Sequence, residues 1–212
     1  MNRETLLVSK LFPLLIIFFA FIQCTQSTSS SSSNKNLLTA AALYTYSTSS
    51  STTNKCTSSS TSTTLTVSST IGVSGSTMSS NYACTLYGGL GYSPDLSWSG
   101  CPSTTKELAL IMTTIALDGT KYNWILYSIP TTVSSLATNT SGVGTAGLGS
   151  DGPTYGYQAP CSSGLGTKDY LFTMYALSAT PTLSGVVTGA VLTSAISSTT
   201  LATGSISLSY TR

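Results

Sequence analysis

The pattern of apolar residues changes at Leu65, and this change limits what the chain can fold into. From Leu65 onward, short apolar runs are separated by Gly, Pro, Ser and Asn, which is typical of β-strands joined by turns. Segments 65–68 and 205–210 alternate apolar with polar residues and predict strands with one face in water. Segments 108–112 and 124–127 are continuously apolar, so we expect them at the centre of a sheet. Residues 65–212 therefore predict one mainly β domain.

One helix is predicted within this domain, over residues 184–196. Apolar residues recur along it at a spacing of four, namely Val187, Val191 and Ala195, and Leu192 and Ile196 lie beside them. Ser184 or Thr182 is a suitable N-cap for it. We expect the two tryptophans, Trp98 and Trp124, to be structural and to pack between sheet layers.

The N-terminal residues 1–23 have the composition of an export signal. Two basic residues precede an apolar stretch, 11–22, which is shorter than the roughly 20 residues that a membrane span needs. We expect this segment to be removed after export. Cys24 follows it directly, which leaves two alternatives: a bacterial lipoprotein that carries its lipid on Cys24, or a protein that is simply secreted.

Residues 24–64 are dominated by Ser and Thr. Such a composition buries too little apolar surface to offset the conformational entropy lost on folding, so it predicts a solvated tether. A short apolar island within it, 36–44, has room for about two helical turns, which are marginal in isolation. We expect this island either to dock on the domain or to stay unstructured.

The chain contains no histidine, and only 7% of its residues are charged, with a net charge of +2. The charge is too small for a basic face that neutralises the phosphates of a nucleic acid. Without histidine, Ser-His-Asp and Cys-His catalytic sites and histidine-based metal sites are excluded. The sequence also lacks a Gly-x-Ser-x-Gly elbow and a recognisable carboxylate pair. We therefore expect no enzyme, no metal and no cofactor.

Four cysteines remain beyond the predicted signal and Cys24. They are Cys56, Cys84, Cys101 and Cys161. An even number of cysteines in an exported chain predicts disulfides, and four cysteines allow three different pairings. The residues alone do not choose among them.

Five blocks of the sequence resemble one known family. They are Ser-Pro-Asp-Leu-Ser-Trp-Ser-Gly at 93–100, Tyr-Asn-Trp-Ile-Leu-Tyr-Ser-Ile-Pro at 122–130, Gly-Tyr-Gln-Ala-Pro-Cys at 156–161, Tyr-Leu-Phe-Thr-Met-Tyr-Ala-Leu at 170–177 and Leu-Ala-Thr-Gly-Ser at 201–205. Together they resemble the phosphatidylethanolamine-binding protein (PEBP) family, in its bacterial and archaeal, Raf kinase inhibitor-like branch. The resemblance implies a β-sandwich with a C-terminal helix and closing strand. It also implies a disulfide between Cys84 and Cys161, and with it one between Cys56 and Cys101.

Members of that family have a small anion-sized pocket that is formed by three segments. In this chain, the first two segments carry different residues from the family's motifs. After the strand 108–112, where the family carries a DPDxP motif, Thr114 and Ala116 stand at the two aspartate positions. Before Trp124, Asn123 stands where the family has a histidine. The resemblance therefore implies a pocket at the same place with different polar groups.

The third segment of the family pocket is altered as well. Lys168 and Asp169 stand at the positions of a histidine and an arginine, and the following Tyr170 is kept. A pocket for an anion needs converging hydrogen-bond donors, which an amide, an ammonium and hydroxyls can supply. The ligand-binding residues that we predict are Thr114, Asn123, Tyr157, Lys168 and Tyr170.

Two functions of different classes remain open on this evidence. The first is an exported, non-catalytic binding domain that holds a small anionic or polar ligand, or a segment of a protein that it inhibits. The second is a structural or adhesive surface lipoprotein that uses the fold only as a scaffold. In that case the residues of the cleft are merely solvated or paired with one another, for instance Lys168 with Asp118 or Asp169. An ordered ligand beside Lys168 would favour the first function over the second.

Overall fold

The structure is a computed structural model that describes Cys56 and residues 62–212. The predicted export signal, the predicted lipidation site at Cys24, the island 36–44 and nearly all of the tether 24–64 lie outside these residues. In the part of the chain that is described, no helix is long and apolar enough to cross a membrane.

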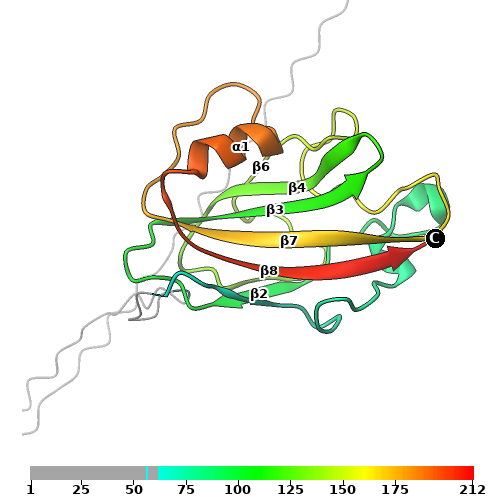
Figure 1. Ribbon diagram of the computed structural model, residues 1–212, viewed down its shortest axis with the longest axis horizontal. Helices are drawn as coiled ribbons and strands as arrows, with labels where there is room; N and C mark the ends of the chain where they lie inside the picture. Colours follow the sequence, from blue (N-terminus) through cyan, green and yellow to red (C-terminus); the bar gives the residue numbers. More distant parts are fainter. Residues whose placement is uncertain (1–55, 57–61) are drawn as a thin grey trace, which may run out of the picture. The chain divides into compact units, whose positions relative to one another are not determined.

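Two antiparallel sheets make up most of residues 62–212 (Figure 1). The larger sheet has the strand order β6-β4-β3-β7-β8, and the smaller one has the order β1-β2-β5. The strands are β1 (Thr66–Ser68), β2 (Leu96–Ser99), β3 (Glu107–Ala116), β4 (Gly119–Ile129), β5 (Ser135–Leu136), β6 (Thr145–Ala146), β7 (Thr167–Leu177) and β8 (Thr200–Thr211). The helices are the 3-10 turns η1 (Ser80–Tyr82) and η2 (Thr85–Tyr87) and the α-helix α1 (Gly189–Ile196).

The predicted mainly β fold is confirmed, and the apolar runs lie where their pattern places them. The run 108–112 lies in β3, which is the middle strand of the larger sheet and is buried along most of its length. The run 124–127 lies in β4 beside it. The alternating segment 205–210 lies in β8, where Ile206 and Leu208 are buried.

The larger sheet separates two apolar cores. One core lies between the two sheets and includes Trp98 from β2 and Trp124 from β4, as predicted for these residues. The other contains Ile125 from β4 together with Leu192 and Ile196 from α1. Figure 1 shows α1 on one side of the larger sheet and β2 on the other. The domain therefore has three layers: a helix, a five-stranded sheet and a three-stranded sheet.

The α-helix is shorter than the predicted span of 184–196, because it begins at Gly189. Gly185 has a φ of 66°, in the left-handed region, which interrupts a helix at that point. The N-cap is Thr188 rather than Ser184 or Thr182, and its side-chain oxygen accepts a hydrogen bond from the backbone N–H of Val191. A threonine cap of this kind sets the first residue of a helix.

The buried face of α1 agrees with the prediction at Leu192 and Ile196, which are buried together with Gly189. It differs at Val191, which is 40% exposed. A β-carbon on Gly189 would lie 2.0 Å from the ring of Tyr122, so the helix can start against β4 only with glycine there. The buried positions follow the period of 3.6 residues better than the uniform spacing of four did.

Contacts of the domain begin before Leu65, along the outer edge of β8. The backbone N–H of Leu65 donates to the carbonyl of Thr203, and the N–H of Thr203 donates to the carbonyl of Thr63. Further along β8, the N–H of Met78 donates to the carbonyl of Ser209. These bonds cover the edge strand, which would otherwise expose unpaired backbone groups.

The described residues contain two disulfides, Cys84–Cys161 and Cys56–Cys101. This is the pairing that the family resemblance implied. Cys56 and Cys101 are 1% and 0% exposed and belong to the core between the sheets. Cys161 is exposed and lies at the edge of the candidate site.

Candidate functional site

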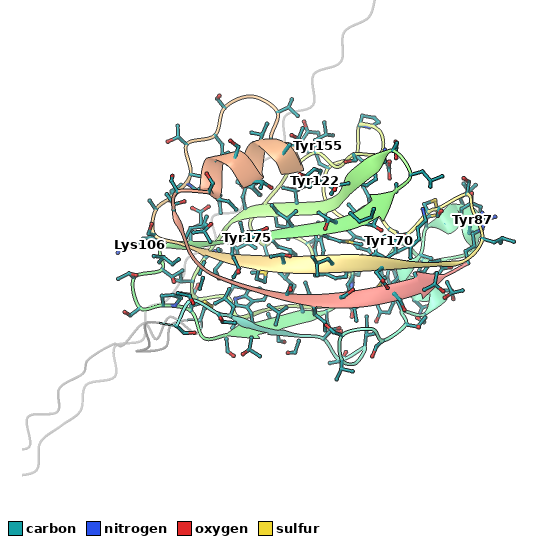
Figure 2. The ribbon with its side chains drawn as sticks, viewed as in Figure 1. Tyr87, Lys106, Tyr122, Tyr155, Tyr170 and Tyr175 are labelled. Carbon is teal, nitrogen blue, oxygen red and sulfur yellow. A yellow bond between two sulfur atoms is a disulfide. The ribbon has the colours of Figure 1, made fainter. Side chains whose placement is uncertain are left out.

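One pocket brings together four of the five predicted ligand-binding residues, Thr114, Asn123, Lys168 and Tyr170. We call it the anion pocket, after the anionic ligand that the sequence predicts for these residues. Its volume is about 380 Å³, which is within the range of small-molecule sites. Figure 2 shows Tyr170 toward the same end of the domain as Tyr87, with Tyr175 nearer the other end of β7. The pocket therefore lies at one end of the larger sheet.

Three neighbouring strands form the floor of the anion pocket. Lys121 on β4 pairs with Thr114 on β3, and Thr114 pairs in turn with Tyr170 on β7. Because residues directly opposite each other in antiparallel strands share one face of the sheet, these three side chains lie side by side. The hydroxyl of Thr114 donates to the backbone carbonyl of Asp169 at 2.7 Å. Its lone pairs remain free to accept a hydrogen bond.

A β-bulge in β4 aims Asn123 into the pocket. Met112 pairs with Trp124 and Thr113 pairs with Tyr122, which leaves Asn123 as an extra residue without a partner on β3. A bulge interrupts the alternation of side chains and redirects one of them. Asn123 is 4% exposed, and its Oδ1 has no hydrogen-bond partner among the residues described. A buried amide oxygen without a donor is unfavourable, and a ligand or water that donates to it would remove that cost.

Asp151 reaches the pocket from a turn that is folded around Gln158. The buried side chain of Gln158 accepts from the N–H of Asp151 at 3.1 Å and donates to the carbonyls of Asp151 and Thr154 at 2.8 and 3.3 Å. The N–H of Gln158 donates to the carbonyl of Asn123 at 2.6 Å. Gln158 thus fixes the acidic turn to the bulge, together with Ser150, which exchanges two hydrogen bonds with Tyr122.

The two lysines of the anion pocket differ in their partners. The ammonium of Lys121 lies 2.6 Å from a carboxylate oxygen of Asp118. This hydrogen bond raises the pKa of Lys121 and lowers the pKa of Asp118. Lys168, which is half-buried, makes no hydrogen bond or ion pair with any residue of the described structure. Lys168 therefore forms no ion pair with Asp118 or Asp169, although its charge makes a small contribution to the lowered pKa of Asp118.

The position of Asp169 explains why it does not pair with Lys168. Consecutive residues of a strand point to opposite faces of the sheet, so Asp169 lies on the other face from its neighbours Lys168 and Tyr170. The sequence predicted Asp118 and Asp169 as the acids near the site, whereas the acid that lines the pocket is Asp151. Its signal in the sequence was the turn Ser-Asp-Gly-Pro at 150–153, directly before the Gly156-Tyr157 block.

Tyr170 supplies a hydroxyl that stays protonated at physiological pH. It is 3% exposed, and burial raises its pKa to about 12, with smaller contributions from Asp151 and Tyr210. A neutral phenol donates a hydrogen bond, which an anionic ligand accepts. The pocket therefore offers an ammonium, an amide and a phenol to one ligand.

Tyr157 lies beside the anion pocket and does not line it. Its ring meets the ring of Trp124 edge-on, with 5.3 Å between the centroids. Its hydroxyl donates to the backbone carbonyl of Tyr82 at 3.0 Å, and burial raises its pKa. The structure thus separates Tyr157 from the other four predicted residues and gives it contacts that hold η1 against β4.

Comparison with known proteins places this fold in a family. A family model described as phosphatidylethanolamine-binding protein matches residues 68–211. The chain belongs to the PEBP family. Among curated relatives, a UPF0098 protein of Methanothermobacter thermautotrophicus is 35% identical over 104 residues, which is 46% of this chain and 66% of that protein. A UPF0098 protein of Chlamydia muridarum is 34% identical over 109 residues, 49% of this chain and 69% of its own length.

Two solved structures share the PEBP fold with this chain. A Chlamydia trachomatis protein whose crystal structure was described as that of a PEBP homologue has a TM-score of 0.64 and 29% identity, and the match covers 71% of this chain and 99% of that one. Escherichia coli YbcL, described as a new member of the mammalian PEBP family, has a TM-score of 0.63 at 23% identity, with 70% and 98% covered. At that identity YbcL shows the fold alone.

The anion pocket of this PEBP chain lies where the resemblance places the family's ligand residues. Thr114 and Ala116, at the two aspartate positions, both line it, as do Asn123 and Lys168, at two histidine positions. Within the described residues, no cluster of three or more acidic or cysteine side chains could hold a metal ion. The pocket is therefore built from hydroxyl, amide and ammonium groups around a single carboxylate.

Proposed function

We propose that this chain is a non-catalytic binding domain whose anion pocket holds a small ligand through an anionic group. The observation that carries the proposal is Lys168, a half-buried lysine without a hydrogen bond or ion pair among the described residues, in one pocket with the hydroxyl of Tyr170. An ammonium that makes no ion pair is available to an anion that enters the same pocket. A phosphate, sulfate or carboxylate group has this chemistry.

The same groups support binding rather than catalysis. The hydroxyl of Thr114 is bonded to a backbone carbonyl, and the phenol of Tyr170 has a pKa of about 12, so neither is an activated nucleophile. The two disulfides, Cys84–Cys161 and Cys56–Cys101, support export to an oxidising compartment as part of this proposal. A lipid on Cys24 remains a prediction outside the described residues.

The pair Lys168→Ala and Lys121→Ala tests the proposal by isothermal titration with inorganic phosphate and with acetate. Lys168→Ala should weaken anion binding by about 10-fold, which corresponds to about 1.4 kcal/mol. Lys121→Ala is the matched control, and we expect a change below about 3-fold, because Asp118 already compensates that charge.

An equal affinity of the parent and Lys168→Ala for phosphate would contradict the proposal. Absence of any anion binding by the parent protein would favour the scaffold function instead. Wild-type-like thermal unfolding of both variants shows that the comparison is made between folded proteins.

A further inference from the structure

The anion pocket continues into a second hollow beside the Cys84–Cys161 disulfide. The second hollow has a volume of about 430 Å³ and shares Asp151 and Cys161 with the anion pocket. Its other walls come from Thr85 in η2 and from the segment around Ala159. The two hollows are neighbours that share these two lining residues, and we call them together the terminal groove.

Charge is concentrated at one end of the terminal groove. Lys121 and Lys168 both line the anion pocket. In the second hollow, the one charged side chain among the described residues is Asp151, at the junction. The other residues that line this hollow are uncharged. Thr85 carries a hydroxyl and Tyr157 an aromatic ring, whereas the amide of Gln158 is already used in hydrogen bonds to Asp151 and Thr154. The groove thus matches a ligand with an anionic end and an uncharged body.

One residue with unpaired backbone groups, Ala159, lines the second hollow. The N–H of Gln158 donates to the carbonyl of Asn123, and the carbonyl of Pro160 accepts from the N–H of Cys84 at 3.1 Å. Ala159, between them, uses neither its N–H nor its carbonyl in any hydrogen bond of the described structure, although it is half-buried. Such free backbone groups pair with an extended peptide, as in strand addition.

We propose that the terminal groove binds the carboxyl-terminal end of an extended polypeptide. The inference rests on the proposed anion pocket, where the terminal carboxylate lies against Lys168 and Tyr170. The residues before the terminus run along the second hollow and exchange backbone hydrogen bonds with Ala159. Asp151 at the junction disfavours an acidic side chain next to the terminus and favours a hydroxyl or basic one. An acyl chain offers no hydrogen bond to the free N–H and carbonyl of Ala159, whereas a peptide backbone pairs with both.

The first test uses the tripeptide acetyl-Ala-Ser-Ala with a free carboxylate, titrated against the protein and compared with acetate, with decanoate and with the same peptide as its carboxyl-terminal amide. We expect the free peptide to bind at least about 10-fold more tightly than acetate or the amide, since each of these lacks one half of the interaction. In an amide NMR experiment, the Ala159 N–H should shift downfield and exchange more slowly when the peptide is bound.

The second test changes the backbone donor itself. Ala159→Pro removes the N–H and should lower the affinity for the peptide to that for acetate, while the affinity for acetate stays unchanged. Ala159→Ser keeps the N–H and is the matched control, with the parent affinity for both ligands. If Ala159→Pro does not fold, the parent protein is titrated with a peptide that is N-methylated at its second amide, which should bind like acetate.

Three outcomes would overturn the inference. Acetate binding that depends on Lys168, with no tighter binding of the peptide, would support the proposed anion pocket and contradict the proposed peptide groove. If decanoate gains as much affinity as the peptide, the groove serves an acyl chain rather than a polypeptide. If neither phosphate, acetate nor the peptide binds, the proposed function and this inference fail together.

Discussion

The two disulfides mark two regions of the domain that use the same bond for different purposes. Cys56–Cys101 is closed into the core between the sheets, next to Trp98. Cys84–Cys161 lies at the edge of the domain, and Cys161 forms part of both hollows of the terminal groove. The comparison indicates that one cross-link maintains the packing of the fold, while the other fixes the shape of a binding surface.

The largest effect is expected from Cys56→Ala combined with Cys101→Ala. The bond closes a loop over a sequence separation of 45, and its loss should lower the free energy of unfolding by about 4 kcal/mol through the entropy of the unfolded chain. The two buried sulfurs also leave a cavity, which adds to the loss. Denaturant titration measures the change. Phosphate affinity at low temperature, where the variant is folded, should stay within about 2-fold.

A smaller loss of stability, with a larger effect on binding, is expected from Cys84→Ala combined with Cys161→Ala. We expect a decrease of about 2–3 kcal/mol in the free energy of unfolding and several-fold weaker phosphate binding. The hydrogen bonds from Cys84 to Pro160 and from Tyr157 to Tyr82 still hold the two segments together.

The variant without Cys84–Cys161 can contradict the comparison between the two disulfides. The loop closed by Cys84–Cys161 is the longer one, with a separation of 77, so loop entropy alone gives it the larger stabilisation, about 4.5 kcal/mol. A greater loss of stability than in the variant without Cys56–Cys101 would show that loop length, and not burial, decides what each bond contributes. Unchanged phosphate affinity would show that the bond does not shape the pocket.

The smallest effect concerns Tyr170 at alkaline pH. An unfolded tyrosine ionises near pH 10, whereas the folded phenol keeps its proton up to about 12. The unfolded state therefore loses protons first, and the contribution of Tyr170 to stability is complete below pH 10 and is lost between 10 and 12. Tyr170→Phe should reduce this loss by on the order of 1 kcal/mol. Tyr155→Phe, at a residue that is 55% exposed, is the control; an equal change in both variants would contradict the assignment.

The sequence predicted the sheets well, because a strand with one buried face alternates apolar and polar residues and a strand buried on both faces is continuously apolar. The continuous run in β3 and the alternating run in β8 both lie where that pattern requires. The start of α1 was not predicted, because periodicity does not register a left-handed glycine such as Gly185 or decide which of several hydroxyl residues forms the cap. Thr188 is the cap because its hydroxyl oxygen accepts a hydrogen bond from the backbone N–H of Val191.

The candidate site was predicted through family resemblance, and the structure adds what that comparison did not contain. Thr114, Asn123, Lys168 and Tyr170 come together because three antiparallel strands align them. Asp151 was missed because its position depends on the side chain of Gln158, a contact that no local pattern encodes. The separation of Tyr157 from the pocket depends on its packing against Trp124, which is likewise a tertiary property.

The extra residue in β4 has a consequence for how such a protein can change. The direction of the side chain at 123 is set by strand pairing on one side and by the backbone bond from Gln158 on the other, and neither depends on which amino acid stands there. A single replacement at that site would alter the chemistry offered to a ligand while leaving the surrounding scaffold intact. The fold thus holds position 123 in the pocket whatever side chain it carries, so a single substitution there can give the pocket a new ligand specificity.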